Sequence, residues 1–184
     1  INLATALAAI GEKVLIVDVD PQGNASTGLG IDRRNRETSS YDVIVGNASI
    51  TEAAVETAVP NLYIVPSTLD LLGVEMEIAG LPDRAHKLRK ALREADTGGV
   101  TYVLIDCPPS LNLLTLNAMA AADSILVPLQ CEFFALEGLS QLLQTVEQVR
   151  RSLNPALSIQ GIVMTMYDGR NNLANQVVED VRAH

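Results

Sequence analysis

The chain has 184 residues, a net charge of −9 and a hydrophobic content of 48%, which is ordinary for one globular domain. Aromatic residues make up only 3% and Trp is absent, so an aliphatic core is expected, as in helices packed on a parallel sheet. The acidic charge argues against tight binding to nucleic acid by the chain alone. Apolar runs stay shorter than the ~20 residues of a membrane span. We therefore expect a cytoplasmic protein.

The first half of the chain is predicted to alternate between helix and strand. A capping box at Ser49 and Glu52 predicts the start of one of the helices. In chain order we expect a helix over 1–10, a strand over 14–19, a loop over 20–40, a helix over 50–57, a strand over 62–65, and a helical region broken near Gly80 and Pro82 whose second part covers 84–95.

The second half continues the alternation. We expect a strand over 103–106, a helix over 113–122, a strand over 124–129, a helix over 136–153, a strand over 159–164 and a helix over 173–184. This order predicts an α/β fold of the P-loop NTPase-like, three-layer type, with a mostly parallel twisted sheet, helices on both faces and right-handed crossovers. We expect one domain over 1–184, truncated at both ends because the chain starts and stops within helix.

Two apolar runs of the sequence end in aspartate. The string VLIVDVDPQGN at 14–24 contains Asp18 and Asp20, and VLIDCPPS at 103–110 contains Asp106. The carboxyl ends of parallel strands form the ligand-binding edge of an open α/β sheet. We therefore expect the carboxylates to share one crevice, where they suit a magnesium-bound phosphate. The alternative is that each aspartate only caps the turn or helix that follows it.

These strings resemble the ParA/Soj chromosome and plasmid partition ATPases, part of a wider group that includes the MinD cell-division ATPases and the nitrogenase iron protein. Residues 14–24 resemble the family's switch I, and 103–110 its switch II or Walker B strand. INLATALA at 1–8 resembles the helix after the family's phosphate loop. The segments 128–139 and 165–170 resemble two further family segments, so the resemblance covers essentially the whole chain.

The resemblance implies an ATPase whose cofactors are ATP and Mg²⁺. Asp20 would orient the attacking water near the γ-phosphate and lie close to the metal, and Asp106 would hold Mg²⁺ through water. The loop at Met166 and Tyr167 would lie near the adenine. Arg170 stands where some members place a basic residue against DNA, although an arginine in a polar loop is more often a solvated surface residue.

The resemblance also implies a partition protein that forms a homodimer on binding ATP. The dimer would bind DNA without sequence preference, and a ParB-type partner would stimulate hydrolysis to segregate a chromosome or plasmid. Such a protein works at the nucleoid and not at a membrane.

One part of the family pattern does not occur in the sequence. The glycine-rich loop G-x-x-x-x-G-K-[ST], which should precede the strand at 14–19, is missing, together with the family's two lysines and its Mg²⁺-ligating Thr. We expect this chain by itself to be inactive, without tight ATP binding or hydrolysis.

Three other functions are considered beside the partition ATPase. A MinD-like positioning ATPase would need a C-terminal amphipathic helix for the membrane. An electron carrier like the nitrogenase iron protein would use two cysteines, and the sequence has Cys107 and Cys131, which otherwise are expected to be buried thiols. The third alternative is a non-enzymatic interaction fragment.

A small basic cluster follows the first aspartate string. Arg33, Arg34 and Arg36 are expected to lie in a solvated loop, with contact to DNA or to a partner as the alternative.

Overall fold

The computed structural model describes residues 1–132 and 135–183. Two residues of the 128–139 segment, Phe133 and Phe134, lie outside the described residues. The chain divides into two compact units, Ile1–Ala121 and Ala122–His184, which are described separately. In the described part of the chain, no helix combines the length and the apolar character that crossing a bilayer requires.

The first unit is built on a four-stranded sheet in the order β2-β3-β1-β4. Its strands are β1 (Val14–Asp18), β2 (Val55–Glu56), β3 (Leu62–Val65) and β4 (Tyr102–Asp106). The central strand β1 pairs in parallel with both β3 and β4, whereas the short β2 pairs with β3 in antiparallel fashion. The three strands predicted from apolar runs in this unit are confirmed.

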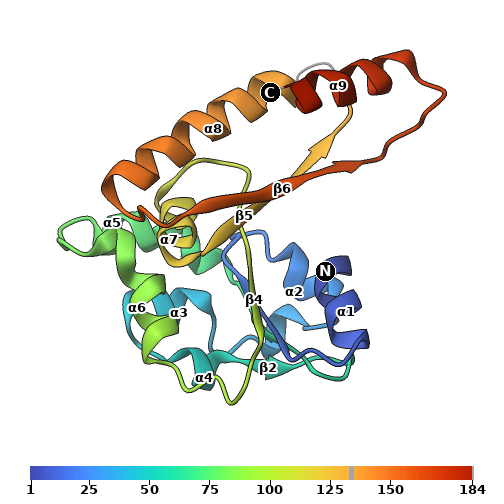
Figure 1. The fold of residues 1–184 in the computed structure, drawn as a ribbon. Coiled ribbons are helices and arrows are strands. Elements are labelled where there is room, and N and C mark those ends of the chain that lie inside the picture. The colour runs from blue at the N-terminus through green and yellow to red at the C-terminus, as the bar shows by residue number, and fades with distance from the viewer. Residues whose placement is uncertain (133–134, 184) are drawn as a thin grey trace. The chain divides into compact units, whose positions relative to one another are not determined.

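Helices cover both faces of this sheet (Figure 1). They are α1 (Asn2–Ala9), α2 (Asn24–Gly28), α3 (Ser40–Val45), α4 (Ile50–Ala53), α5 (Val74–Ile78), α6 (Lys87–Glu94) and α7 (Leu113–Ala121), with 3-10 turns at Arg33–Asn35, Leu69–Gly73 and Arg84–His86. Successive side chains of β1 enter opposite cores, since strand residues alternate between faces. Leu15 and Val17 pack in a core with residues of α3 to α7, and Val14 and Ile16 pack with residues of α1 and α2.

Two predictions in the first unit are wrong. The expected loop over 20–40 contains α2 and ends at the start of α3, because Ala25 packs into the core beside β1 and Ser26 is fully buried. The expected helix over 50–57 stops at Ala53, because Val55 and Glu56 pair with β3 instead. The capping box that starts α4 is confirmed.

The second unit contains the parallel strands β5 (Ser124–Gln130) and β6 (Ser158–Thr165) with the helices α8 (Ala135–Ser152) and α9 (Asn172–Ala183). Val127, Leu129, Leu139 and Val177 form its core. Strand and helix therefore alternate here as the sequence predicted; the expected last helical residue, His184, lies outside the described residues. The two units together confirm an α/β fold with mostly parallel strand pairing.

Candidate functional site

Two carboxylates stand side by side at the carboxyl edge of the first unit's sheet. Asp18 and Asp106 are the last residues of β1 and β4 and are direct partners in the strand register. The pairing continues past the strand end, where the N–H of Val19 donates to the Asp106 carbonyl oxygen at 2.9 Å. Parallel register thus brings the ends of the two aspartate strings to one edge of the sheet, while the expected crevice stays a prediction.

Asp18 is completely buried and fully hydrogen-bonded. Its carboxylate accepts from the Ser26 N–H at 2.9 Å, from the Ser26 Oγ at 2.6 Å and from the Asp20 N–H at 3.2 Å. Burial still raises the pKa of Asp18 above its usual value, although the hydrogen bonds from Ser26 act in the opposite direction. Asp18 therefore organises the turn around it and is not exposed to a ligand.

Asp20 lies on the turn that Asp18 organises. Its carbonyl oxygen accepts from the Gly23 N–H at 2.9 Å, and its Oδ1 accepts from the Gln22 N–H at 2.9 Å. The Ser67 hydroxyl, at the end of β3, also donates to the Asp20 carbonyl oxygen. The backbone of Asp20 is thus fixed from two sides, and one carboxylate oxygen caps its own turn.

Asp106 is accessible at the surface, in contrast to its neighbour in the register. Its carboxylate takes part in none of the hydrogen bonds or ion pairs found among residues 1–132 and 135–183. Surrounding protein atoms raise the pKa of Asp106 by desolvation, and the charge of Asp18 raises it further. The edge therefore carries negative charge that a cation would neutralise.

The acidic edge fits one mode of magnesium binding. Among the described residues, no group of three or more His, Cys, Asp or Glu side chains is arranged to hold a metal ion directly. Mg²⁺ keeps several waters and uses one or two carboxylates together with substrate phosphates. Asp106, accessible and unpaired in the described chain, fits that kind of water-mediated contact.

Cys107 follows directly after Asp106, in the acidic surroundings of the strand end. Burial, and then the charges of Asp106, Asp20 and Asp18, raise the pKa of the thiol to about 12. Cys107 is half-buried, whereas Cys131 is buried as expected.

The sequence interpretation of one arginine was wrong. Arg33 and Arg34 are exposed, as expected for a solvated loop, whereas only 8% of Arg36 is exposed. Its guanidinium donates to three oxygens that neighbour the Asp20 turn: the Ser67 carbonyl at 2.8 Å, the Thr27 hydroxyl at 2.8 Å and the Ile31 carbonyl at 2.9 Å. Nothing in the local sequence distinguishes Arg36 from its two neighbours, because its acceptors come from elsewhere in the chain.

The other predicted site residues belong to the second unit. Met166 is 82% exposed and has a positive φ of 54°, at the bend that directly follows β6. The Tyr167 hydroxyl donates to Asn175 Oδ1 at 2.6 Å. Arg170 forms a two-point ion pair with Asp168 through Nε at 3.0 Å and Nη2 at 2.8 Å. The expected roles of these residues toward adenine and DNA stay predictions.

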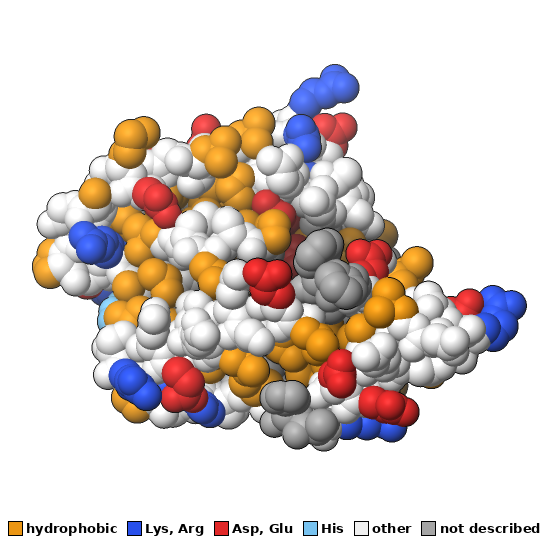
Figure 2. All heavy atoms as spheres, turned by 90° about the horizontal axis from the view of Figure 1, so that it is seen from above, with side chains coloured by type: hydrophobic (Ala, Val, Ile, Leu, Met, Phe, Trp, Pro, Cys, Tyr) orange, Lys and Arg blue, Asp and Glu red, His pale blue; other side chains and the backbone are white. Residues whose placement is uncertain are grey.

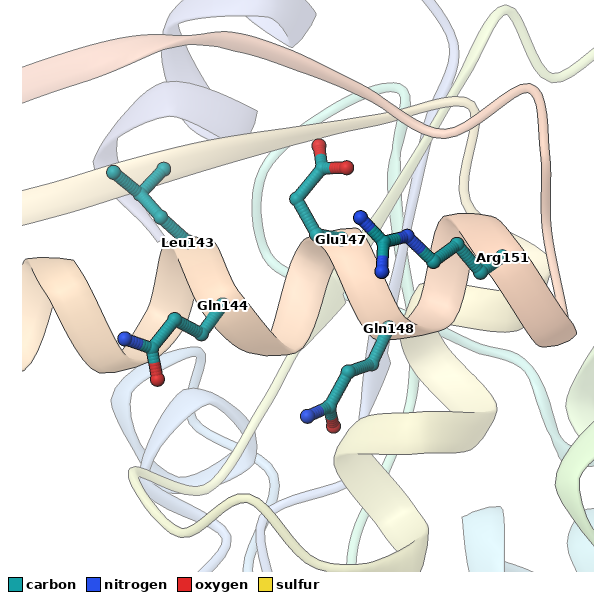
Figure 3. Close-up of a pocket in the computed structure, with 5 residues that line it drawn as sticks. All are labelled: Leu143, Gln144, Glu147, Gln148 and Arg151. Atoms are coloured by element: carbon teal, nitrogen blue, oxygen red, sulfur yellow. The ribbon is translucent and has the colours of Figure 1, made fainter.

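A hollow on α8 is separate from these residues. It measures about 460 Å³ and is lined by one stretch of that helix (Figure 3), namely Leu143, Gln144, Glu147, Gln148 and Arg151. The lining contains one acidic side chain, Glu147, and one basic side chain, Arg151. It has neither the paired carboxylates nor the glycine-rich backbone of a phosphate site. We therefore assign it no part in the chemistry.

Comparison with known proteins places the sequence among partition ATPases. A family model described as an AAA domain matches residues 1–159. The chain is 61% identical to the chromosome partitioning protein ParA of Caulobacter vibrioides, over the whole chain and 69% of that protein. It is 48% identical to the sporulation initiation inhibitor protein Soj of Bacillus subtilis, over the whole chain and 72% of that protein.

Solved structures share the fold. The cobyrinic acid a,c-diamide synthase of Mycobacterium smegmatis with bound ADP and magnesium matches with a TM-score of 0.92 and 37% identity, covering 99% of this chain and 74% of that one. A plasmid partition protein of Borrelia burgdorferi matches with a TM-score of 0.83 over 100% of this chain and 78% of its own; at 23% identity that likeness shows the fold alone.

The mostly parallel sheet with acidic strand ends and helices on both faces defines the class: an α/β protein with the fold of P-loop nucleotide hydrolases. Within that class, the chain belongs to the ParA/Soj family of chromosome-partitioning ATPases.

Proposed function

We propose that the protein containing this chain hydrolyses ATP with Mg²⁺ to drive partition of a chromosome or plasmid. The observation that carries the proposal is the pair of register-matched aspartates, Asp18 and Asp106, with the fixed Asp20 turn beside them. It is supported by the 61% identity to a chromosome partitioning protein, and by the ADP and magnesium bound in the solved 37%-identical relative.

In this proposal each carboxylate has its own task. Asp20 accepts a hydrogen bond from the attacking water and orients it toward the γ-phosphate. Asp106 holds waters of the Mg²⁺ shell. When bound, Mg²⁺ neutralises charge on the phosphates. Asp18 stays buried and accepts a hydrogen bond from the Asp20 N–H. In this proposal, hydrolysis depends on positioning and on charge stabilisation and has no covalent intermediate.

The remaining parts of the proposal concern assembly. ATP binding brings two copies together, the dimer binds DNA without sequence preference through residues that include Arg170, and a ParB-type partner stimulates turnover at the nucleoid. Met166 and Tyr167 form the loop next to the adenine. The support for these parts is the family, whose named members include the partitioning proteins of Myxococcus xanthus and Treponema pallidum.

The Asp20→Ala variant tests the catalytic assignment in the full-length protein. We expect turnover to fall about 10²-fold or more, because the attacking water loses the carboxylate that orients it, while the Kd for ATP–Mg²⁺ stays within a few-fold. Steady-state hydrolysis and nucleotide titration measure the two quantities. A loss of binding as large as the loss of turnover would overturn the role of Asp20.

A second comparison separates the ATPase from an interaction fragment. ATP–Mg²⁺ binding is measured for the 184-residue chain and for a form extended upstream through a glycine-rich phosphate loop. Binding by the extended form alone supports the ATPase. If neither form binds, the family fold serves an interaction role in this protein, and the ATPase proposal fails.

A further inference from the structure

A buried polar network joins the Asp20 turn to the carboxyl end of β3. Ser26 Oγ donates to Asp18 and accepts from the Ser67 N–H at 3.0 Å. The Ser67 hydroxyl donates to the Asp20 carbonyl oxygen, and the Ser67 carbonyl oxygen accepts from Arg36. All three polar groups of Ser67 are therefore used, and both serines are completely buried.

Arg36 belongs to the same network and donates hydrogen bonds to it from a position later in the chain than the Asp20 turn. Besides Ser67, its Nη2 reaches the Thr27 hydroxyl, which itself donates to the Gly23 carbonyl oxygen at 2.9 Å, and the Ile31 carbonyl oxygen. The guanidinium thus spans from the segment that follows Asp20, which contains α2, to the residues after β3. A cation so buried is costly unless its donors are satisfied, so the arrangement favours one geometry of that segment.

Gly23 provides a second, independent sign that the guanidinium is part of the turn. A Cβ on Gly23 would collide with Arg36 Nη1 and would lie 3.3 Å from the Ser67 carbonyl oxygen. Gly23 also has a φ of +61°, a conformation in which glycine is favoured. The absence of a side chain at Gly23 therefore leaves the space through which the Arg36 side chain reaches Ser67.

We propose that Arg36 is a positioning residue for ATP hydrolysis: its guanidinium fixes the Gly23–Ile31 segment, which contains α2, to Ser67 and so sets the place of Asp20. Arg36 acts through Ser67, which donates to the Asp20 carbonyl oxygen, and through Thr27, which donates to the Gly23 carbonyl oxygen. This inference rests on the proposed function, since it assigns Arg36 to the reaction at Asp20.

The test is single-turnover ATP hydrolysis by the full-length protein in excess over ATP. The rate constant reports the geometry at Asp20 in correctly folded molecules, and the amplitude reports the fraction of molecules that fold and bind ATP. For Arg36→Met we expect a rate constant lower by about 10-fold or more with an ATP Kd within about 3-fold of wild type, since a small displacement of a reacting group costs rates of this order.

Three variants make the comparison specific. Arg36→Lys should recover only part of the rate, because one ammonium cannot span Ser67, Thr27 and Ile31. Thr27→Val keeps the shape but removes one acceptor of the guanidinium, and should lower the rate constant about 3-fold. The matched control is Arg34→Met at the neighbouring exposed arginine, where the rate constant should not change.

The outcomes separate the inference from the proposed function. A reduced amplitude with an unchanged rate constant for Arg36→Met means a purely structural role and overturns the inference. If Arg36→Met does not fold, unchanged rate constants for both Arg36→Lys and Thr27→Val overturn it as well. Turnover in wild type that Asp20→Ala abolishes, with no effect at Arg36, leaves the proposed function standing. No turnover in wild type overturns both.

Discussion

Asp106 has a cost for stability that follows from its place next to Asp18. Its pKa is raised by desolvation and by the Asp18 charge, so the folded state binds a proton more tightly than the unfolded state does. Stability from this group is therefore lost as pH rises from the ordinary value of 3.8 through the raised value of the folded state. A carboxylate that lowers the stability of the folded state in this way is typical of a ligand-binding edge.

The Asp106→Asn variant should therefore be more stable than wild type at neutral pH. We expect a gain of roughly a few tenths of a kcal/mol in the free energy of unfolding, since water screens this accessible carboxylate. The gain should disappear below pH 3.8, where both Asp106 and Asp18 lose charge. Urea denaturation of the nucleotide-free protein at the two pH values measures it. An equal gain at both would show that the charge is not the cause.

The two aspartate strings could be placed from the sequence, but their supporting residues could not. Asp18, Asp20 and Asp106 follow apolar strands, and parallel strands bring their ends to one edge. Ser67 and Arg36 reach that edge from positions with no motif of their own, and an arginine in a polar loop is usually solvated. Only the tertiary contacts show that Arg36 points inward.

At the scale of the element, helices and strands with a clear local pattern were predicted well, and those that depend on tertiary contacts were not. The apolar run Leu62–Val65 was predicted without error as β3. The sequence NASTG of α2 consists mostly of weak helix formers, and it is helical here where Ala25 packs in the core and Ser26 binds Asp18. Tertiary contacts also explain why α4 ends early and Val55 joins β3.

The capping box of α4 leads to a prediction for stability. The Ser49 hydroxyl accepts from the Glu52 N–H, and the Glu52 carboxylate accepts from the Ser49 N–H at 2.8 Å. Ser49→Ala should lower the free energy of unfolding by about 1 kcal/mol, because the first turn loses its side-chain acceptor. Ser110→Ala, the same substitution at another exposed loop position of the first unit, is the control and should change it little. Similar losses for both would remove the cap as the explanation.

At the scale of the whole molecule, charge constrains the proposed DNA binding. The net charge is −9, and on the face seen in Figure 2 the basic side chains stand among acidic and hydrophobic ones. Phosphate contacts by such a chain must come from individual arginines brought together by assembly. Arg170 is one of these in our proposal, but Asp168 holds it in a two-point ion pair.

Opposite effects on DNA binding are therefore expected at neighbouring positions. Arg170→Ala should weaken binding of the ATP-bound protein to any DNA sequence and reduce the salt slope by about 1. Asp168→Asn should strengthen binding, since it releases the guanidinium and removes a negative charge. Arg182→Ala, at an exposed arginine of α9, serves as the control. Binding isotherms at several salt concentrations measure these effects, and weaker binding by Asp168→Asn would refute the assignment of Arg170.

The shortest strand has a consequence for solubility. β2 consists of two residues, lies at one end of the first unit's sheet and carries the exposed Glu56. An open strand edge is a template on which other chains can add strands and aggregate, and a short edge with a charged side chain offers little to such an addition. This side of the first unit's sheet is thereby protected against uncontrolled self-association.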